Sequence, residues 1–281
     1  MTAATLQNAV DPRQASAASP ALAMPPAAAT CALKMLTLNT HKGFTSFNRR
    51  MVLHELREAV RGVSADVVFL QEVIGAHTAH PVRYPRWPEV SQYEFLADSI
   101  WPAFAYGRNA SYPEGHHGNA LLSKFPIVAH QNHDVSVAGP ERRGLLHCVL
   151  EVPGDKAGHP RRLHAICVHL GLAGSHRRKQ MDMLCDLISR EIPDDAPLVV
   201  AGDFNDWRVH ANRRLRERAG LTEVFNESRG ASARTFPVRW PVLRLDRIYV
   251  RNVVVRHLAV LSLRPWSHLS DHAGLLAEVA L

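Results

Sequence analysis

Polar residues of catalytic type follow several apolar, strand-like runs of this chain. Near the C-terminus, Ser270-Asp271-His272 places a carboxylate beside an imidazole, directly before the apolar run 273–281. Four other such runs end on polar groups, namely Asn39, Glu72, His169 and the pair Asp203 and Asn205. Strand ends that face the same way can bring these groups together in one site.

Together with Asp246, these residues form a set whose chemistry is informative. Carboxylate and amide oxygens are hard ligands that suit Mg²⁺ or Mn²⁺, and imidazoles carry protons near neutral pH. No cysteine belongs to the set, which argues against a structural zinc site. The sequence also lacks a G-x-S-x-G elbow, a Walker loop and a G-x-G-x-x-G fingerprint. The set therefore favours metal-assisted attack of water on a phosphate ester.

Each of these residues also has a purely structural interpretation. Asn39 could cap a turn, Glu72 could be a solvated strand end, and His169 could be a hydrogen-bonded core histidine. Asp246 could form an ion pair with Arg247 or Arg244 on a strand surface. Asp203 could begin an Asx turn, but burying its carboxylate after the apolar run 198–201 without a partner would be costly. The structural interpretation is plausible for any one residue, whereas the coincidence of all of them at strand ends favours a site.

The first elements of the chain predict how two of these groups meet. Residues 33–38 form an apolar strand that ends at Asn39, and residues 47–60 have apolar residues at helical spacing before Gly62. A second apolar strand over 66–70 delivers Glu72. This strand, helix, strand unit brings two polar tips to one edge of a sheet.

The rest of the chain alternates many strands with few helices. Strands are predicted over 104–108, 119–123, 127–137, 144–152, 162–169, 198–201, 243–250, 253–263 and 274–281, helices over 92–100, 175–191 and 212–219, and loops over 80–88 and 109–118. Some of the strands are fully apolar. This pattern predicts a single domain with an α/β architecture, in which two central sheets are covered by helices.

Composition narrows the partners and the compartment. The chain has 281 residues, 46% of them hydrophobic, and a net charge of +7, which favours anionic partners such as nucleic acid, a phospholipid surface or phosphorylated metabolites. A solvated basic face would give the same charge. Four cysteines lack metal-like or disulfide-like spacing, which indicates buried free thiols in a reducing, cytoplasmic location.

The N-terminal segment is expected to stand apart from the domain. Residues 1–30 are rich in Ala and Pro and lack a basic segment followed by an apolar one, so we expect a disordered tail rather than a secretory signal. The chain has no apolar run long enough to span a bilayer.

The order of the motifs resembles one known family. N-x-H, Q-E, G-N-A-L-L-S, V-H-L, G-D-F-N, L-D-R-I and S-D-H follow one another as in the endonuclease/exonuclease/phosphatase superfamily, the deoxyribonuclease I-like proteins. The resemblance covers residues 33–281, so it implies a catalytic domain over 31–281. It implies a four-layered α/β sandwich of two central, mostly antiparallel sheets flanked by helices, with the site at one end of the sheets.

The resemblance also implies roles for the residues of the set. Glu72, with Asn39 nearby, would be the main Mg²⁺ (or Mn²⁺) ligand, and Asp271 would help through the water shell of the metal. His272 would be the base that activates water, oriented and made more basic by Asp246. Asp203 would hold the nucleophile, bind a second metal or protonate the leaving oxygen.

Three further positions would contact the phosphate. Asn205 would donate to a non-bridging phosphate oxygen, and His169 would donate to the phosphate or protonate the leaving group. Abasic-site endonucleases lack the equivalent of His169, so this residue favours other branches of the superfamily. His116 and His117 either face the phosphate or lie in a solvent-exposed loop.

The predicted protein is a monomeric, metal-dependent hydrolase of an anionic phosphodiester, of nuclease type. Basic runs such as Arg142-Arg143 could follow a nucleic acid backbone, or could be solvated faces. One alternative is a head-group phosphodiesterase acting on phospholipid or sphingomyelin at an anionic membrane. Another is a non-catalytic scaffold of the same fold that binds phosphate.

Overall fold

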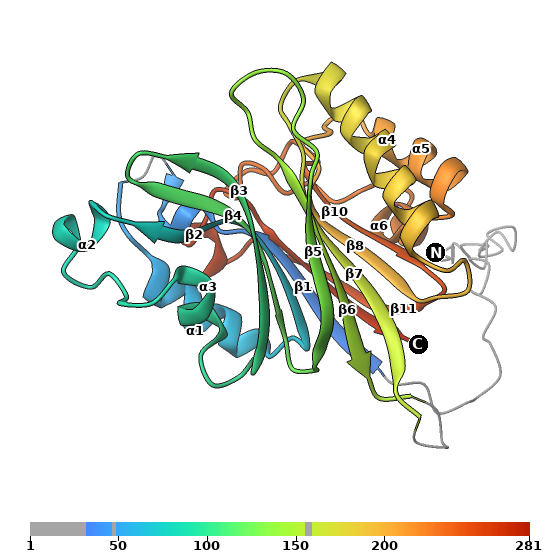
Figure 1. Cartoon of the computed structure of the whole chain (residues 1–281), viewed down its shortest axis with the longest axis horizontal. Coiled ribbons are helices and arrows are strands. Elements are labelled where there is room, and N and C mark those ends of the chain that lie inside the picture. The colour runs from blue at the N-terminus through green and yellow to red at the C-terminus, as the bar shows by residue number, and fades with distance from the viewer. Residues whose placement is uncertain (1–31, 47–48, 155–158) are drawn as a thin grey trace, which may run out of the picture.

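Two six-stranded sheets pack face to face in the computed structural model, which describes residues 32–46, 49–154 and 159–281 (Figure 1). The first sheet has the order β11-β12-β1-β2-β4-β3 and the second the order β5-β6-β7-β8-β10-β9. The strands of the first sheet are β1 (Ala32–Asn39), β2 (Val67–His77), β3 (Ala103–Tyr112), β4 (Gly115–Ser123), β11 (Val254–Leu261) and β12 (Gly274–Ala280). Those of the second are β5 (Ile127–Asp134), β6 (Gly144–Val152), β7 (Arg161–His169), β8 (Leu198–Asp203), β9 (Thr222–Glu223) and β10 (Asp246–Arg251).

Helices cover the outer faces of both sheets. They are α1 (Leu53–Val63), α2 (His80–Arg83), α3 (Gln92–Ala97), α4 (Gly174–Glu191), α5 (His210–Ala219) and α6 (Val224–Arg229). Figure 1 shows α1 and α3 on the first sheet and α4 and α5 on the second. The two sheets with helices outside them form four layers, which confirms the predicted four-layered sandwich. None of the helices that the structure describes is both long and apolar enough to cross a membrane.

The alternation of side chains along the strands builds the layers. On β7, Ala165 and Cys167 face the first sheet, where they join a core that includes Phe69 of β2 and Leu146 of β6. Ile166, the residue between them, packs on the opposite face under α4. Because successive strand residues point to opposite faces, one short strand supplies both cores.

The pairing of the strands gathers the predicted site residues at one edge. Strands β1 and β2 are parallel, with Asn39 beside Gln71, and β7 and β8 are parallel, with His169 beside Asp203. Strand β10 runs antiparallel to β8 and starts at the same edge, so that Asp246 lies opposite Asp203. All other pairs within the two sheets are antiparallel, which confirms the predicted mostly antiparallel sheets.

Some predicted elements were wrong. The predicted polar loop over 109–118 is the tip of a hairpin, since β3 runs to Tyr112 and β4 begins at Gly115. Strand β3 is an edge strand with a half-exposed face, so its polar residues resemble those of a loop. The first helix begins at Leu53 rather than at residue 47, and α2 lies within the predicted loop 80–88. The predicted disordered tail over 1–30 lies outside the described residues.

Candidate active site

Glu72 projects from a bulge in the middle of β2, which continues to His77 instead of ending near Glu72 as predicted. The pairing of β2 with β4 shifts register between Leu70 and Val73, and Glu72 adopts a φ of 57° there. A bulge of this kind re-aims a side chain relative to a regular strand. Thr40, just after β1, donates its hydroxyl to the carbonyl oxygen of Gln71, which fixes the bulge against the neighbouring strand.

Asn39 connects Glu72 to the second sheet. Its Nδ2 donates to Oδ2 of Asp203 at 3.2 Å and lies 3.4 Å from Oε1 of Glu72, while its Oδ1 accepts from the backbone N–H of His41 at 3.0 Å. The amide group of Asn39 therefore presents its donor side to both carboxylates. It bridges two predicted metal ligands that lie 131 residues apart in the sequence.

Glu72 carries its negative charge at neutral pH. Burial acts to raise its pKa, but the neighbouring His169, Lys42 and His41 lower the pKa to about 2. The contact with Asn39 is long for a hydrogen bond, so the oxygens of this carboxylate keep lone pairs for another partner. An ionised carboxylate of this kind is a suitable ligand for a hard divalent cation.

Asp203 lies at the centre of the polar cluster. Its Oδ2 is 3.6 Å from Nε2 of His169 and 3.9 Å from Nε2 of His272, and its Oδ1 accepts from the backbone N–H of Asn205 at 2.9 Å. Burial raises the pKa of Asp203 to about 6, although the charge of His272 acts to lower it. The predicted cost of burying this carboxylate is thus offset by several polar partners.

The turn after β8 depends on one glycine. Gly202 has a φ of 148°, and a Cβ atom there would lie 1.9 Å from the carbonyl oxygen of Val168, so only glycine fits between the parallel strands. Asn205 then adopts a φ of 50° and donates its side-chain amide to the carbonyl oxygen of Leu170. The G-D-F-N motif therefore combines a close backbone approach with two oriented polar side chains.

His272 is held by Asp246 from the second sheet. Nδ1 of His272 lies 2.9 Å from Oδ2 of Asp246, which leaves Nε2 facing Asp203 and the cavity. Burial acts to lower the pKa of His272, but the carboxylates of Asp246 and Asp203 raise it to about 10. The other oxygen of Asp246, Oδ1, is buried without a hydrogen-bond partner.

A cavity of about 280 Å³ opens over these groups. Its lining includes the predicted residues Glu72, His169, Asp203, Asn205 and His272, together with Arg143, Leu172, Trp207, Phe236, Leu243 and Leu245. The structure therefore brings predicted metal-binding, acid–base and phosphate-binding groups to one opening. Its wall is partly apolar, and the ring of Phe236 packs against that of His272 at 5.0 Å between centroids.

Sequence reasoning missed Arg143 and Trp207 as parts of this site. Arg143 stood in a basic run that could equally be a solvated face, but its guanidinium is mostly buried and donates to the carbonyl oxygen of Leu170. Trp207 forms one wall and carries the guanidinium of Arg177 at 4.5 Å from its ring centroid. No sequence signal separates these two residues from the other basic and aromatic residues nearby.

The remaining predicted residues lie at different places around the cavity. Asp271 contacts His41, with its Oδ1 3.3 Å from Nδ1, and does not line the cavity. His117 does not line the cavity either, and its ring packs against that of Tyr112 at 5.8 Å between centroids. Burial and the charge of Lys42 lower the pKa of His117 to about 4, while the charge of Glu72 opposes this. His116, the next residue on β4, instead bonds to the hydroxyl of Tyr106.

A second cavity of about 360 Å³ lies beyond Lys42. It combines cationic and aromatic side chains in its lining, which consists of Lys42, Phe44, Ile74, His77, His80, Arg83, Tyr84 and Tyr112. The rings of His77 and His80 stack with centroids 3.4 Å apart. Lys42, which lines this cavity, lowers the pKa of Glu72 through its charge.

The residues present fit a divalent cation. Glu72 supplies an ionised carboxylate, Asp203 a second one, and Asp246 an oxygen without a hydrogen-bond partner. Asp203, Asp246 and His272 also place one ligand atom each within 4.8 Å of one another. These oxygen-rich groups match the preference of hard cations such as Mg²⁺ or Mn²⁺.

Known proteins share both the sequence pattern and the fold. The sequence model of the endonuclease/exonuclease/phosphatase family matches residues 36–272. YbhP of Escherichia coli (strain K12), itself an uncharacterized protein, is 55% identical over 258 residues, which cover 92% of this chain and all of YbhP. The endonuclease/exonuclease/phosphatase from Beutenbergia cavernae DSM 12333 has a TM-score of 0.69 at 19% identity, over 89% of this chain and 72% of that chain.

Two other solved structures share the fold, with similar TM-scores and sequence identities. TDP2 of D. rerio, complexed with a single strand DNA product, has a TM-score of 0.62 at 20% identity, over 88% of this chain and 98% of that chain. The mannosyl-6-phosphatase Bt3783 of Bacteroides thetaiotaomicron VPI-5482 has a TM-score of 0.64 at 15% identity, over 89% of this chain and all of the other. At these identities the likeness concerns the fold alone.

The family match includes every predicted site residue, from Asn39 at the end of β1 to His272 before β12. The Escherichia coli relative extends the likeness over nearly the whole chain. The sequence match and the four-layered sandwich agree. The chain belongs to the endonuclease/exonuclease/phosphatase family.

Proposed function

We propose that this protein is a divalent-metal-dependent phosphodiesterase of nuclease type. The observation that carries the proposal is the position of His272, whose Nδ1 is bonded to Asp246 while its Nε2 faces Asp203 in a cavity shared with Glu72. A histidine oriented by a carboxylate on one side and open on the other is suited to take a proton from water.

In this proposal a cation bound beside Asp203 would lower the pKa of His272 from about 10, the value in the metal-free site, and the neutral ring would then accept the proton of the attacking water at Nε2. Asp246 fixes the ring through Nδ1 and stabilises the imidazolium that forms. Asp203, between the two imidazoles, orients the water or transfers a proton to the leaving oxygen. His169, Asn205 and His117 donate hydrogen bonds to the non-bridging phosphate oxygens, while His116 bonds to the hydroxyl of Tyr106.

Glu72 would be the principal ligand of Mg²⁺ or Mn²⁺, with Asp203 as a second candidate. Asn39 would orient both carboxylates through Nδ2, and Asp271 would contribute through the water shell. When bound, the cation supplies stabilisation of the negative charge that develops on the phosphate oxygens. Arg143, which lines the same cavity, would add positive charge on the opposite wall.

The aromatic cavity favours a nucleic acid over a lipid as substrate. It joins Lys42 and Arg83, which suit phosphates, to the rings of Tyr84 and Tyr112, on which a base can stack. The net charge of +7 supports an anionic polymer. TDP2 of D. rerio, which shares the fold, was solved with a single strand DNA product, and this supports the same class of substrate here.

Hydrolysis by the purified chain tests the proposal. Single-stranded DNA, duplex DNA, RNA, vesicles containing phosphatidylserine or sphingomyelin, and a sugar phosphate are incubated with Mg²⁺ or Mn²⁺, with EDTA and His272→Ala as controls. Cleavage of nucleic acid that needs both the metal and His272 supports the proposal. Cleavage of lipid alone would show that the substrate is a lipid head group. Cleavage of the sugar phosphate alone would show that the protein is a phosphomonoesterase. Equal rates for wild type and His272→Ala would contradict the mechanism.

We also propose that the protein works as a monomer in a reducing, cytoplasmic environment. The cysteines among the described residues, Cys148, Cys167 and Cys185, are buried and unpaired. Burial raises the pKa of Cys185 to about 11, so this thiol stays protonated and unreactive. Size-exclusion chromatography with light scattering tests the monomer.

A further inference from the structure

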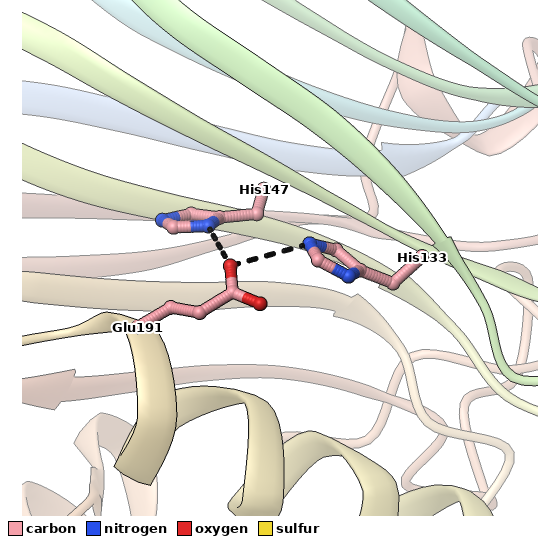
Figure 2. A group of neighbouring side chains, drawn as sticks. All are labelled: His133, His147 and Glu191. Atoms are coloured by element: carbon pink, nitrogen blue, oxygen red, sulfur yellow. Dashed lines mark ion pairs between the residues drawn. The ribbon is translucent and has the colours of Figure 1, made fainter.

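Two histidines and a glutamate converge on the outer side of the second sheet, away from the active-site cavity. His133 lies on β5, His147 on β6, and Glu191 is the last residue of α4. Figure 2 shows both imidazole rings turned toward the carboxylate. Oε2 of Glu191 lies 3.6 Å from Nε2 of His133 and 3.7 Å from Nδ1 of His147.

These separations suit ligands that share a metal ion. Hydrogen bonds between nitrogen and oxygen are about 2.7–3.2 Å long, so both contacts are too long to be good ones. Nitrogen and oxygen ligands lie about 2.0–2.2 Å from a tetrahedral zinc ion, which places neighbouring ligand atoms about 3.3–3.6 Å apart. The three ligand atoms of this cluster lie within 4.8 Å of one another, which leaves only a small adjustment for tetrahedral geometry.

The ring nitrogens that face Glu191 are available for coordination. Nε2 of His133 is buried and has no hydrogen-bond partner. Nε2 of His147 lies 3.0 Å from Nδ1 of His164 on β7, so a proton shared between these two atoms leaves Nδ1 of His147 with a free lone pair. A hydrogen bond on the far nitrogen is the usual way in which proteins orient a metal-binding histidine.

The cluster is separate from the predicted catalytic metal site. His147 is paired with Ile166, and both residues belong to the face of the second sheet that α4 covers. His169, by contrast, lines the active-site cavity together with Glu72. The active-site cavity holds oxygen-rich ligands, whereas this cluster offers two imidazole nitrogens and one carboxylate.

We propose that His133, His147 and Glu191 form a second metal site, which binds a borderline transition-metal ion, zinc foremost. Imidazole ligands favour zinc over Mg²⁺ or Ca²⁺, and three protein ligands leave a fourth position for water or an outside ligand. The ion ties the end of α4 to β5, the edge strand of the second sheet. Occupancy of this site therefore stabilises the packing of α4 on the sheet.

Zinc binding by the full-length, chelator-stripped protein tests this proposal. Competition against a chromophoric zinc chelator gives stoichiometry and affinity for wild type, His133→Gln, Glu191→Gln and the control His130→Gln, an exposed histidine on the same strand. Wild type and the control are each expected to bind one more zinc ion per chain than His133→Gln and Glu191→Gln do. If the stoichiometry is the same, the zinc affinity of wild type and of the control is expected to be at least tenfold higher than that of the two variants. Equal stoichiometry and affinity in all four proteins would overturn the site.

Two further measurements separate this site from the active site and from a folding defect. Zinc is expected to raise the melting temperature of wild type, of the control and of Glu72→Gln. It is expected to leave the melting temperature of Glu191→Gln unchanged, although the circular dichroism spectrum of this variant shows that it is folded like wild type. His164→Ala is expected to weaken zinc binding by about 10–100-fold, because it removes the partner that orients His147. An unchanged zinc affinity in His164→Ala, or equal thermal stabilisation of Glu191→Gln, would contradict the proposal. Neither readout depends on hydrolysis, so the site and the proposed catalytic function can fail separately.

Discussion

Nδ1 of His272 lies 2.9 Å from Oδ2 of Asp246, a residue 26 positions earlier in the sequence and on the other sheet. The hydroxyl of Ser270 supports this arrangement, because it donates to the carbonyl oxygen of Asn39 and accepts from the backbone N–H of His272. The imidazole is therefore fixed at the junction of the two sheets. Its chemistry depends on a carboxylate that reaches it only when the sandwich is assembled.

Replacing Asp246 with Asn is expected to lower the pKa of His272 and to slow hydrolysis about 10²–10⁴-fold. The carboxylate raises that pKa, so a neutral amide of the same shape removes the effect while it keeps a hydrogen-bonding group next to Nδ1. NMR titration of the histidine rings gives the pKa, and steady-state kinetics gives the rate. Asp194→Asn, at an exposed position, serves as the control. An unchanged rate in Asp246→Asn would remove Asp246 from the mechanism.

The same pair predicts how stability depends on pH in EDTA. The pKa of His272 is raised from 6.5 to about 10, so the folded protein holds a proton that the unfolded chain releases above pH 6.5. The stabilisation is complete below pH 6.5 and is lost as the pH rises toward 10, by at most about 1.4 kcal/mol per pH unit. In urea denaturation, the unfolding free energy of wild type is expected to exceed that of Asp246→Asn most below pH 6.5. This difference should become smaller as the pH rises toward 10. A constant difference would indicate that His272 is neutral in the folded protein.

The edge that carries the active site could be predicted from the sequence because its signals are local. An apolar run such as 198–201 predicts a buried strand, and a polar residue that follows within two positions, such as Asp203, is expected where that strand ends. The parallel pairing of β7 with β8 then brings His169 beside Asp203. Pairing of this kind follows from the order of strands and helices, which the sequence also indicates.

Arg143 and the aromatic cavity could not be predicted in this way. Arg143 reaches the active site only because the segment before β6 folds back on Leu170, a contact between residues 27 positions apart. Tyr112 lies on a hairpin whose polar edge strand resembles a loop, and His77 lies five residues beyond Glu72, where the polar pair Gln71-Glu72 predicted the end of the strand. Their contacts depend on strand register and on how far each strand extends, which residue types specify weakly.

Glu72→Gln is expected to reduce the metal-dependent rate by at least about 100-fold, because it removes the charge of the proposed main ligand. Loss of about 3 kcal/mol of charge stabilisation in the transition state corresponds to that factor. Rates measured over a range of Mg²⁺ or Mn²⁺ concentrations should also show a weaker dependence on the cation than wild type. Glu58→Gln, on the exposed face of α1, is the matched control. A wild-type rate and wild-type metal dependence in folded Glu72→Gln would place the metal elsewhere.

Tyr112→Leu is expected to raise the KM for single-stranded DNA about 10–100-fold and to leave the KM for a small aryl phosphodiester unchanged. The ring of Tyr112 lines the aromatic cavity beyond Lys42, where a base next to the scissile phosphate would stack, and stacking of one base contributes about 1–3 kcal/mol. Leucine keeps an apolar side chain at this position but cannot stack in the same way. Trp240→Ala, at an aromatic residue that is 79% exposed and lines neither cavity, is the control. Equal increases of KM for both substrates would mean that Tyr112 supports the active site itself, and no increase for either would exclude the aromatic cavity from substrate binding.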